Sequence, residues 1–545
     1  MQIDEKARGQ SRRAEAAVLD EAHLGDIRGA LGTLKEQERG TRRTWRQRLL
    51  ALAVIIGPGL IVMVGDNDAG GVATYAQAGQ NYGTSLLWTL VLLIPVLIVN
   101  QEMVVRLGAV TGVGHGRLII ERFGKWWGAF SVGDLFLLNF LTIVTEFIGI
   151  SLGASYFGIS PFIAVPLAAA LLMLITTSGR FEVWERFMLL FVVANALIIP
   201  LAVLSHPAAG QVLHDFVVPG IKGGVSGTAI LLIIAIVGTT VAPWQLFFQQ
   251  SNVIDKRITP RWIAYERADT VIGAFVVIVG AAAIMITAAF AFQNTPEVGH
   301  FTDARGVAEG IARYVSHSAG AIFAVILIDA SIIGASAVTL ATSYAFGDVF
   351  HLHHSLHRPW REAKVFYGSY AAVVLVAAGI VLIPHAPLGL ITTAVQALAG
   401  LLLPSATVFL LLLCNDRAVL GPWVNKPWLN ALASLILGVL LMLSLILVVT
   451  TIFPSIDVGI LVLVIAVGLV GGLATLFGLS LRSRHATPAP RFKGDKESWR
   501  MPPLALLSRP VWSRTTRFAM IALSSYLGLA VLLLLVKAVE LATGH

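Results

Sequence analysis

The sequence predicts an all-α polytopic membrane protein in which two of the helices are interrupted. Of its 545 residues, 56% are hydrophobic and only 13% are charged, and the mean hydropathy is +0.80. A soluble domain carries about 25% charged residues. Two apolar stretches, residues 57–79 and 230–251, contain Gly, Pro and polar residues near their middle. Because hydrocarbon offers no hydrogen-bond partner to a freed backbone group, such breaks must line a cavity or pack inside protein.

The composition argues against several other kinds of protein. The single cysteine, Cys414, excludes an intramolecular disulfide and a metal site made of cysteines. The formal net charge of +8 lies at the chain ends and in alternate loops, so we expect no nucleic-acid partner. Residues 1–46 are polar and end in a basic run. This pattern predicts a cytoplasmic tail, partly helical or disordered, rather than a cleavable signal peptide.

Apolar stretches of about 20 residues predict twelve membrane spans and a thirteenth after a polar stretch. The predicted spans are 49–75, 84–107, 127–155, 159–177, 185–205, 226–252, 265–292, 318–349, 364–384, 388–414, 428–453, 456–481 and 517–541. Basic residues such as Arg117, Lys256 and Arg358 concentrate in the loops after even-numbered spans. The positive-inside rule therefore places the N-terminus in the cytoplasm of a multi-pass protein.

The first and sixth predicted spans carry the two breaks, so spans 1–5 and 6–10 form matching sets that start on opposite sides of the membrane. This is the pattern of an inverted repeat, in which substrate lies between the broken helices near the midplane. The predicted organisation is a polar tail (1–46), a transporter core (47–414, with repeats at 47–205 and 226–414), additional spans (428–481), a basic cytoplasmic segment (482–516) and a last span with the C-terminus (517–545).

The first break carries two carboxylates, and intramembrane ionisable groups are by default functional. Asp68 is the leading candidate because it precedes the small residues 69–71, where carbonyls such as that of Gly65 are freed from helix bonds. Carboxylate, carbonyl and water oxygens are what a hard divalent cation needs. Asp68 could instead cap the half-helix that follows it. Asp66 and Asn67 could bind the ion, bind its waters or cap the unwound stretch.

The second break offers a different set of donors. The candidates that line it are Thr239, Thr240, Ala242, Pro243, Trp244 and Gln245. Pro243 has no N–H and so frees a carbonyl near Thr239, while Gln245 offers an amide oxygen. Trp244 could simply pack. Gln396, in the middle of span 10, either joins the site or makes an interhelical hydrogen bond.

At these residues the chain resembles the Nramp family of divalent metal transporters, over about residues 50–414. The matching stretches are G-P-G at 57–59, A-T-x-x-Q-A-G-x-x-Y-G at 73–83, R-L-G-x-V-T-G at 106–112, the loop residues Gly179, Arg180 and Glu182, and Asp68–Gly71 in place of the D-P-G-N metal motif. Glu146 matches the family's third-span glutamate, and Gln396 lies eight residues before Pro404 as the family's tenth-span glutamine does. The resemblance implies a LeuT-type fold with metal bound between broken helices 1 and 6.

The chain departs from the family pattern at four positions. Gly71 stands for the metal-binding asparagine, Ala242 and Trp244 for the sixth-span methionine and histidine, and Ile143 for a third-span aspartate. The resemblance therefore points to the Nramp-related magnesium transporter branch. A site without sulfur suits Mg²⁺ and Mn²⁺, and a larger site suits an ion that keeps several waters. Two residues of the family's proton route, the sixth-span histidine and the third-span aspartate, are therefore missing.

The predicted function is alternating-access transport of Mg²⁺ and/or Mn²⁺ across a prokaryotic inner membrane, without obligatory proton coupling. The metal is cargo, and no cofactor is expected. The predicted ligands are Asp68, Asp66, Gly65, Gly71, Thr239, Ala242, Gln245 and Gln396, with Glu146, Asn67, Thr240 and Trp244 as proton carriers or supports of the ligands.

Three alternatives compete with this prediction. One is a proton-coupled Mn²⁺/Fe²⁺ symporter, with Asp66 in place of a lost proton acceptor. Another is an organic-solute transporter on the same fold, which the two carboxylates disfavour. The third is an enzyme, for which the sequence shows no zinc motif, nucleophile elbow or phosphate loop in a suitable context. The His-rich loop at 351–357 could collect metal at the cytoplasmic mouth or be a solvated basic loop.

Overall fold

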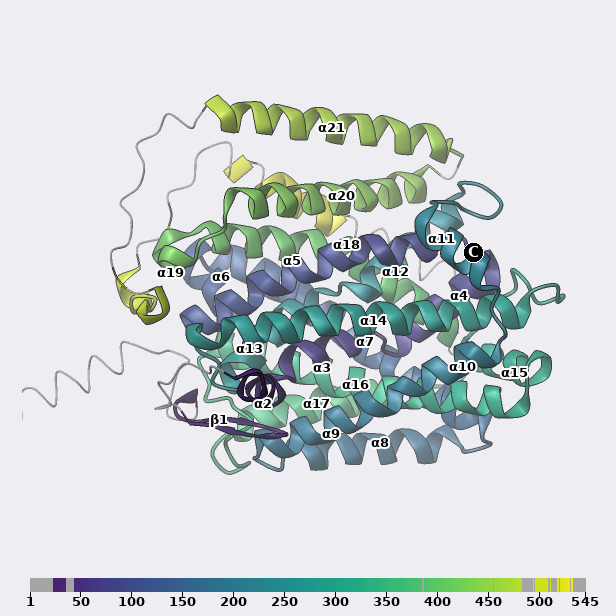
Figure 1. The fold of residues 1–545 in the computed structure, drawn as a ribbon, viewed down its shortest axis with the longest axis horizontal. Helices are drawn as coiled ribbons and strands as arrows, with labels where there is room; N and C mark the ends of the chain where they lie inside the picture. The colour runs from purple at the N-terminus through teal and green to yellow at the C-terminus, as the bar shows by residue number, and fades with distance from the viewer. Residues whose placement is uncertain are drawn as a thin grey trace, which may run out of the picture.

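The computed structural model is a helical bundle with one small β-hairpin (Figure 1). It describes residues 23–35, 44–384, 387–453, 455–482, 494, 496–507, 510, 517–518, 520–529 and 531–532. Among these residues, ten helices are long and apolar enough to cross a membrane, or up to eleven if one bent pair counts as a span. The prediction of a helical, polytopic membrane protein is confirmed.

The first half of the chain contains one broken helix and a series of long apolar helices. The elements are α2 (Trp45–Ile55), α3 (Pro58–Val64), α4 (Ala69–Tyr82), α5 (Leu87–Thr111), α6 (His115–Phe123), α7 (Lys125–Tyr156), α8 (Pro161–Thr176), α9 (Phe181–Ala194), η2 (Asn195–Leu197), α10 (Ile198–Leu204) and α11 (Ala209–Val217). Side-chain oxygens of Thr44 and Ser160 cap α2 and α8, as expected for residues that satisfy the first free N–H groups.

The second half repeats this arrangement from a second broken helix. The elements are α12 (Gly227–Thr240), α13 (Pro243–Asp255), η3 (Pro260–Trp262), α14 (Ile263–Phe292), α15 (Ala304–Tyr314), α16 (His317–Phe350), α17 (Lys364–Val381), α18 (Leu388–Asn415), α19 (Arg417–Leu420), η4 (Gly421–Trp423), α20 (Pro427–Ile452), α21 (Val458–Arg482), η6 (Lys496–Ser498) and η7 (Leu504–Leu506). Part of the predicted last span, 517–541, and much of the basic segment 482–516 lie outside the described residues.

The first span differs from the prediction of one interrupted helix over 49–75. The apolar run ends as α2 at Ile55, and α3 leaves it at an angle of 55°. Gly57 explains the bend, because its φ of 152° is open to glycine and Pro58 follows it as the first residue of α3. After the break, α4 continues to Tyr82, seven residues beyond the predicted end.

The N-terminal tail contains a hairpin that packs against the bundle. Strands β1 (Ile27–Gly29) and β2 (Gly32–Leu34) pair antiparallel, with Ile27 opposite Leu34. The N–H of Ala30 donates to Glu185 Oε2 of α9 at 2.5 Å, and Arg186 Nε donates to the Ala30 carbonyl at 2.9 Å. The expectation of a helical or disordered tail is therefore wrong for this part of it.

Long-range packing holds the two broken helices in the interior. Helix α14 packs along α3 and α4, α12 packs along α18, and α16 packs along α7. Helices α6 and α19 lie at one end of the bundle, and α11 and α15 lie at the other (Figure 1). The first end carries Arg117 of α6, Lys256 at the end of α13 and Arg358 in the loop after α16, and we call it the basic end.

Candidate metal site

The first break is a short non-helical segment between α3 and α4. It begins at Gly65, where the N–H groups of Asp66 and Asn67 bond to carbonyls only three residues back. Asp68 is the N-cap of α4, and its Oδ1 accepts from the N–H of Gly71 at 2.7 Å. The capping role considered for Asp68 is thus present. It leaves other lone pairs of the same carboxylate for a cation, because two carboxylate oxygens accept at about four sites.

The second break lies between Thr240, the last residue of α12, and Pro243, the first residue of α13. The carbonyl four residues before Pro243 loses its helical donor because proline has no N–H. Thr239 Oγ1 has no hydrogen-bond partner within the described part of the chain. The Gln245 side chain folds back to donate from Nε2 to the Thr240 carbonyl at 3.2 Å. Amide, hydroxyl and carbonyl oxygens therefore meet at this break.

The structure brings the two breaks together with Gln396 of α18. A Cβ built on Gly71 would lie 2.6 Å from the Asp66 carbonyl oxygen and 3.1 Å from Thr239 Oγ1. A Cβ on Gly70 would overlap the Gln396 side chain, whose Nε2 has no partner among the described residues. The side chains of Asp66, Asp68 and Gln396 are all at least 98% buried. Segments separated by more than 300 residues in the sequence thus meet at one enclosed polar site.

Three carboxylates are concentrated there without a positive partner. Glu146 of α7 accepts from the N–H of Ala69 at 3.1 Å through Oε2. A Cβ built on Gly334 would lie 2.5 Å from the same oxygen and 2.8 Å from Cβ of Asp68, so the two acids are neighbours. In the described part of the chain, Asp66, Asp68 and Glu146 form no ion pair with Lys, Arg or His. Buried negative charge of this kind requires a cation or protons.

The remaining predicted residues lie around this centre in different ways. Asn67 turns toward α14, where its Nδ2 donates to the Val277 carbonyl at 3.2 Å. Trp244 packs on Gly65 and Phe248, which is the packing role considered for it. The Ala242 carbonyl accepts from the N–H of Gln245 at 3.2 Å. Thr240 Oγ1 is hydrogen-bonded to Tyr75 Oη at 2.7 Å and so links α12 to α4.

Two residues of the site were missed from the sequence. Gln101 of α5 donates from Nε2 to Gln245 Oε1 at 2.8 Å, and its own Oε1 has no partner among the described residues. Tyr75 is fully buried beside the second break. The sequence could have indicated Gln101, because Asn100 and Gln101 are consecutive amides near the middle of an apolar span. Tyr75 gave no such signal, since one tyrosine in an apolar helix is unremarkable.

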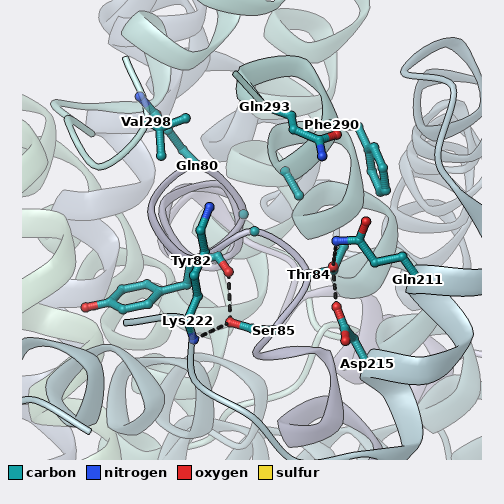
Figure 2. Close-up of a pocket in the computed structure, with 13 residues that line it drawn as sticks. Gln80, Tyr82, Thr84, Ser85, Gln211, Asp215, Lys222, Phe290, Gln293 and Val298 are labelled. Atoms are coloured by element: carbon teal, nitrogen blue, oxygen red, sulfur yellow. Dashed lines mark hydrogen bonds between the residues drawn. The ribbon is translucent and has the colours of Figure 1, made fainter. Parts of the chain in front are cut away.

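A separate cavity of about 260 Å³ lies at the end of the bundle away from the basic loops (Figure 2). Thr84 donates to Asp215 Oδ2 at 2.5 Å, and Gln211 Nε2 donates to Thr84 Oγ1 at 2.9 Å. The residues that line this cavity include neither Asp66 nor Asp68. The cavity is therefore distinct from the site between the breaks, and its one carboxylate, Asp215, already accepts a hydrogen bond.

The His-rich loop is only partly solvated. His354 is buried and lies 3.1 Å from Asp348 Oδ1, and His357 stacks on Phe181. His351 and His353 are exposed. No group of three or more His, Cys, Asp and Glu side chains among the described residues could hold a metal ion. A site between the breaks would therefore depend on amide, carbonyl and water oxygens as well as carboxylates.

A family profile described as natural resistance-associated macrophage protein-like, Nramp, matches residues 59–450. The chain belongs to the Nramp family. Divalent metal cation transporters named MntH are similar to it: that of Xylella fastidiosa is 27% identical over 78% of this chain and 89% of its own length, and that of Bacillus subtilis is 26% identical over 73% and 93%. The predicted membership of the Nramp family is confirmed, and these relatives are transporters rather than enzymes.

Solved structures support the same fold. A manganese transporter of Eremococcus coleocola, in complex with an aromatic bis-isothiourea compound, superimposes with a TM-score of 0.60 at 22% identity, over 81% of this chain and 95% of its own. A histidine-to-alanine mutant of that transporter gives 0.61 at 21% identity, over 85% and 98%. The LeuT-type arrangement predicted for this Nramp chain is thus confirmed.

Proposed function

We propose that this Nramp protein carries Mg²⁺ and Mn²⁺ across the cell membrane by alternating access, without obligatory proton coupling. The observation that carries the proposal is the meeting of Asp66 and Asp68 with Gln245 and Gln396 at two apposed helix breaks, in a buried site without a cationic side chain among the described residues. The ion would bind there with part of its water shell, held by the carboxylates, the amides and carbonyls near Gly65 and Thr239.

The charge of the site favours a divalent cation over an organic acid. Taking carboxylates out of water is costly unless an opposite charge compensates. Neither oxygen of Asp66 has a hydrogen-bond partner within the described residues. A doubly charged ion would satisfy these oxygens together, whereas a substrate carboxylate would add negative charge to them.

The donor set favours hard ions. Ala242 brings no thioether, Trp244 brings an indole that donates only, and Gly71 brings no side chain to the first break. Soft sulfur ligands select softer transition metals, whereas carboxylate, carbonyl and water suit Mg²⁺ and Mn²⁺. Mg²⁺ gives up water reluctantly and is usually bound through one or two carboxylates. A Cβ on Gly71 would lie only 2.6 Å from the Asp66 carbonyl oxygen in this enclosed state, so room for such waters would require the two breaks to move apart.

The membrane potential can drive the uptake. A divalent ion that enters down an inside-negative potential gains about 4.6 kcal/mol per 100 mV, twice the value for one charge. The basic end would face the cytoplasm by the positive-inside rule, which places the N-terminus inside as well. Because both breaks are enclosed here, release requires movement of one repeat against the other, as in other transporters with inverted repeats.

Uptake into liposomes tests the proposal. Purified protein should load Mg²⁺ and Mn²⁺ in response to an imposed inside-negative potential, while a pH dye in the lumen reports no acidification in step with the metal. Empty liposomes give the leak. Acidification that scales with metal uptake, together with exclusion of Mg²⁺, would overturn the proposal.

One contact favours a second function, proton-coupled transport of Mn²⁺ or Fe²⁺. Glu146 lies beside Asp68 and reaches the first break through the N–H of Ala69. A carboxylate so placed could accept a proton when the metal leaves Asp68. The two functions differ in reversal potential, which shifts with the pH gradient only if protons move with the metal. Strong competition by Cd²⁺, a soft ion, would also favour the second function.

A further inference from the structure

A second cavity lies at the basic end of the bundle, and none of the residues that line it belongs to the candidate metal site. It has a volume of about 270 Å³ between α5, the start of α14, the start of α20 and η6. Four basic side chains line it, together with a single carboxylate: Arg106, Arg267, Lys426, Lys496 and Glu102. The excess of positive charge in one cavity indicates an anionic ligand.

The acidic side chain is already used by the two arginines. Arg106 Nη2 donates to Glu102 Oε2 at 3.1 Å, and Arg267 Nε donates to Glu102 Oε1 at 3.0 Å. The ammonium groups of Lys426 and Lys496 make no ion pair with any described residue, and both side chains are exposed. Although the Lys496 side chain is exposed, partial desolvation and then the positive charges of Arg106, Arg267 and Lys426 lower its pKa. One carboxylate against four basic side chains leaves a net positive charge in the cavity.

The lining of the cavity combines a fixed arginine with apolar side chains. Arg106 is fixed by hydrogen bonds from Nη1 to the Trp423 carbonyl at 2.5 Å and from Nη2 to Asn425 Oδ1 at 2.6 Å. Lys496 Nζ lies 4.0 Å from the centre of the Trp423 ring. The apolar part of the lining consists of Ile98, Val99 and Leu429, together with Trp428, whose side chain is 62% exposed. Tryptophan is typical of the membrane–water interface.

We propose that this cavity binds the phosphate headgroup of an anionic phospholipid, with Lys426, Lys496 and Arg267 as its cationic partners. Basic pockets between membrane helices on the cytoplasmic side are recognised sites for such headgroups. The acyl chains would leave along the apolar wall formed by α5 and α20. The lipid would thereby connect α20, outside the two repeats, to helices α5 and α14 of the core. The site stands independently of which ion is transported.

Lipid binding by the purified protein tests the site. Native mass spectrometry and thermal unfolding would be measured with phosphatidylglycerol, phosphatidylcholine, glycerol phosphate and inorganic phosphate. Each basic residue near a membrane surface contributes about fivefold in affinity. The variant with Arg267→Gln and Lys426→Gln should therefore bind phosphatidylglycerol about 25-fold more weakly. A variant with Lys125→Gln and Arg361→Gln loses the same charge from exposed positions outside the cavity and should bind as the natural chain does.

Three outcomes would overturn the assignment. The first is equal binding of phosphatidylglycerol by the natural chain and the cavity variant. The second is equal binding of phosphatidylcholine and phosphatidylglycerol, which would remove the charge requirement. The third is binding of glycerol phosphate or inorganic phosphate as tight as that of the lipid, which would assign the cavity to a soluble phosphate. If the double variant fails to fold, the single Lys426→Gln variant should show about a fivefold loss by the same measurement.

Discussion

Buried carboxylates occur in two regions of this molecule, and their surroundings differ. At the basic end, Asp269 accepts from the N–H groups of Gly57, Gly59 and Leu60 at 3.1, 2.7 and 3.1 Å. Asp255, in the same region, accepts from Tyr344 Oη, from the Ser355 hydroxyl and from the N–H of Leu356. Each of these carboxylates is satisfied by the protein itself.

The carboxylates at the helix breaks are not satisfied in this way. Both oxygens of Asp66 and one of Glu146 have no hydrogen-bond partner among the described residues, although the side chains are fully buried. An unpaired buried polar group costs about 1–3 kcal/mol of stability, and a charged one costs more. We therefore expect a bound ligand to compensate these carboxylates. Glu266 at the basic end is also buried with neither oxygen hydrogen-bonded among the described residues, so what distinguishes the breaks is three neighbouring carboxylates without a cationic side chain among those residues.

The largest effect is expected from Asp68→Ala. Removal of one partner of a buried charge pair costs about 3–5 kcal/mol, which corresponds to more than about 100-fold in metal affinity. Uptake of Mg²⁺ and Mn²⁺ into liposomes should be lost while expression and monodispersity stay normal. Asp68→Asn keeps the shape and the cap and should lose transport as well. Uptake within a few fold of the natural chain would contradict the role of this carboxylate.

A change of ion preference should follow Ala242→Met. The thioether introduces a soft ligand at the second break, so Cd²⁺ and Mn²⁺ should gain over Mg²⁺, by about tenfold for 1.4 kcal/mol of differential binding. Competition against labelled Mn²⁺ uptake measures the ratio. Ala242→Leu has similar bulk without sulfur and is the matched control. If both variants change the ratio equally, bulk rather than sulfur decides it.

Asp269→Ala should act on stability instead. The substitution leaves three buried N–H groups at the start of α3 without an acceptor, which is expected to cost about 3 kcal/mol or more, at 1–3 kcal/mol for each. Thermal unfolding in detergent should shift downward, while metal affinity measured on the folded fraction changes by less than about threefold, a little over half a kcal/mol. An unchanged unfolding temperature together with lost metal binding would instead assign Asp269 to metal binding and contradict its structural role.

A smaller, pH-dependent effect is expected at His354. Burial opposes its charged form, but the hydrogen bond and charge of Asp348 outweigh burial and raise the pKa of the imidazole. Its contribution to stability is then complete below the unfolded pKa of about 6.5 and is lost as pH rises through the folded value. The difference in unfolding temperature between the natural chain and His354→Gln should be largest near pH 6 and shrink toward pH 8.5. A constant difference would contradict the ion pair.

The smallest effect is expected from Asp215→Asn in the cavity of Figure 2. The amide retains an oxygen to accept from Thr84, so Mg²⁺ uptake should change by less than about twofold, under half a kcal/mol. A large loss of uptake would mean that the ion passes through this cavity.

The sequence alone pointed to those residues of the candidate site that are unfavourable in an apolar membrane helix. Asp66, Asp68, Pro243 and Gln396 stand out because each is costly in an apolar run. The bend at Gly57 has a local cause in the Gly57–Pro58 pair, whereas the docking of the hairpin at Ala30 and the contact of Gln101 with Gln245 could not be predicted. They depend on which helices pack together, and no local pattern in a single sequence encodes a contact between residues more than 100 positions apart.

The most direct test of the central claim is anomalous diffraction from crystals of the protein soaked with Mn²⁺. We expect one strong anomalous peak between the two helix breaks, within bonding distance of the Asp68 carboxylate and facing Gln245. A peak in the cavity around Asp215, at the His-rich loop, or anywhere outside the two breaks, with none beside Asp68, would contradict it.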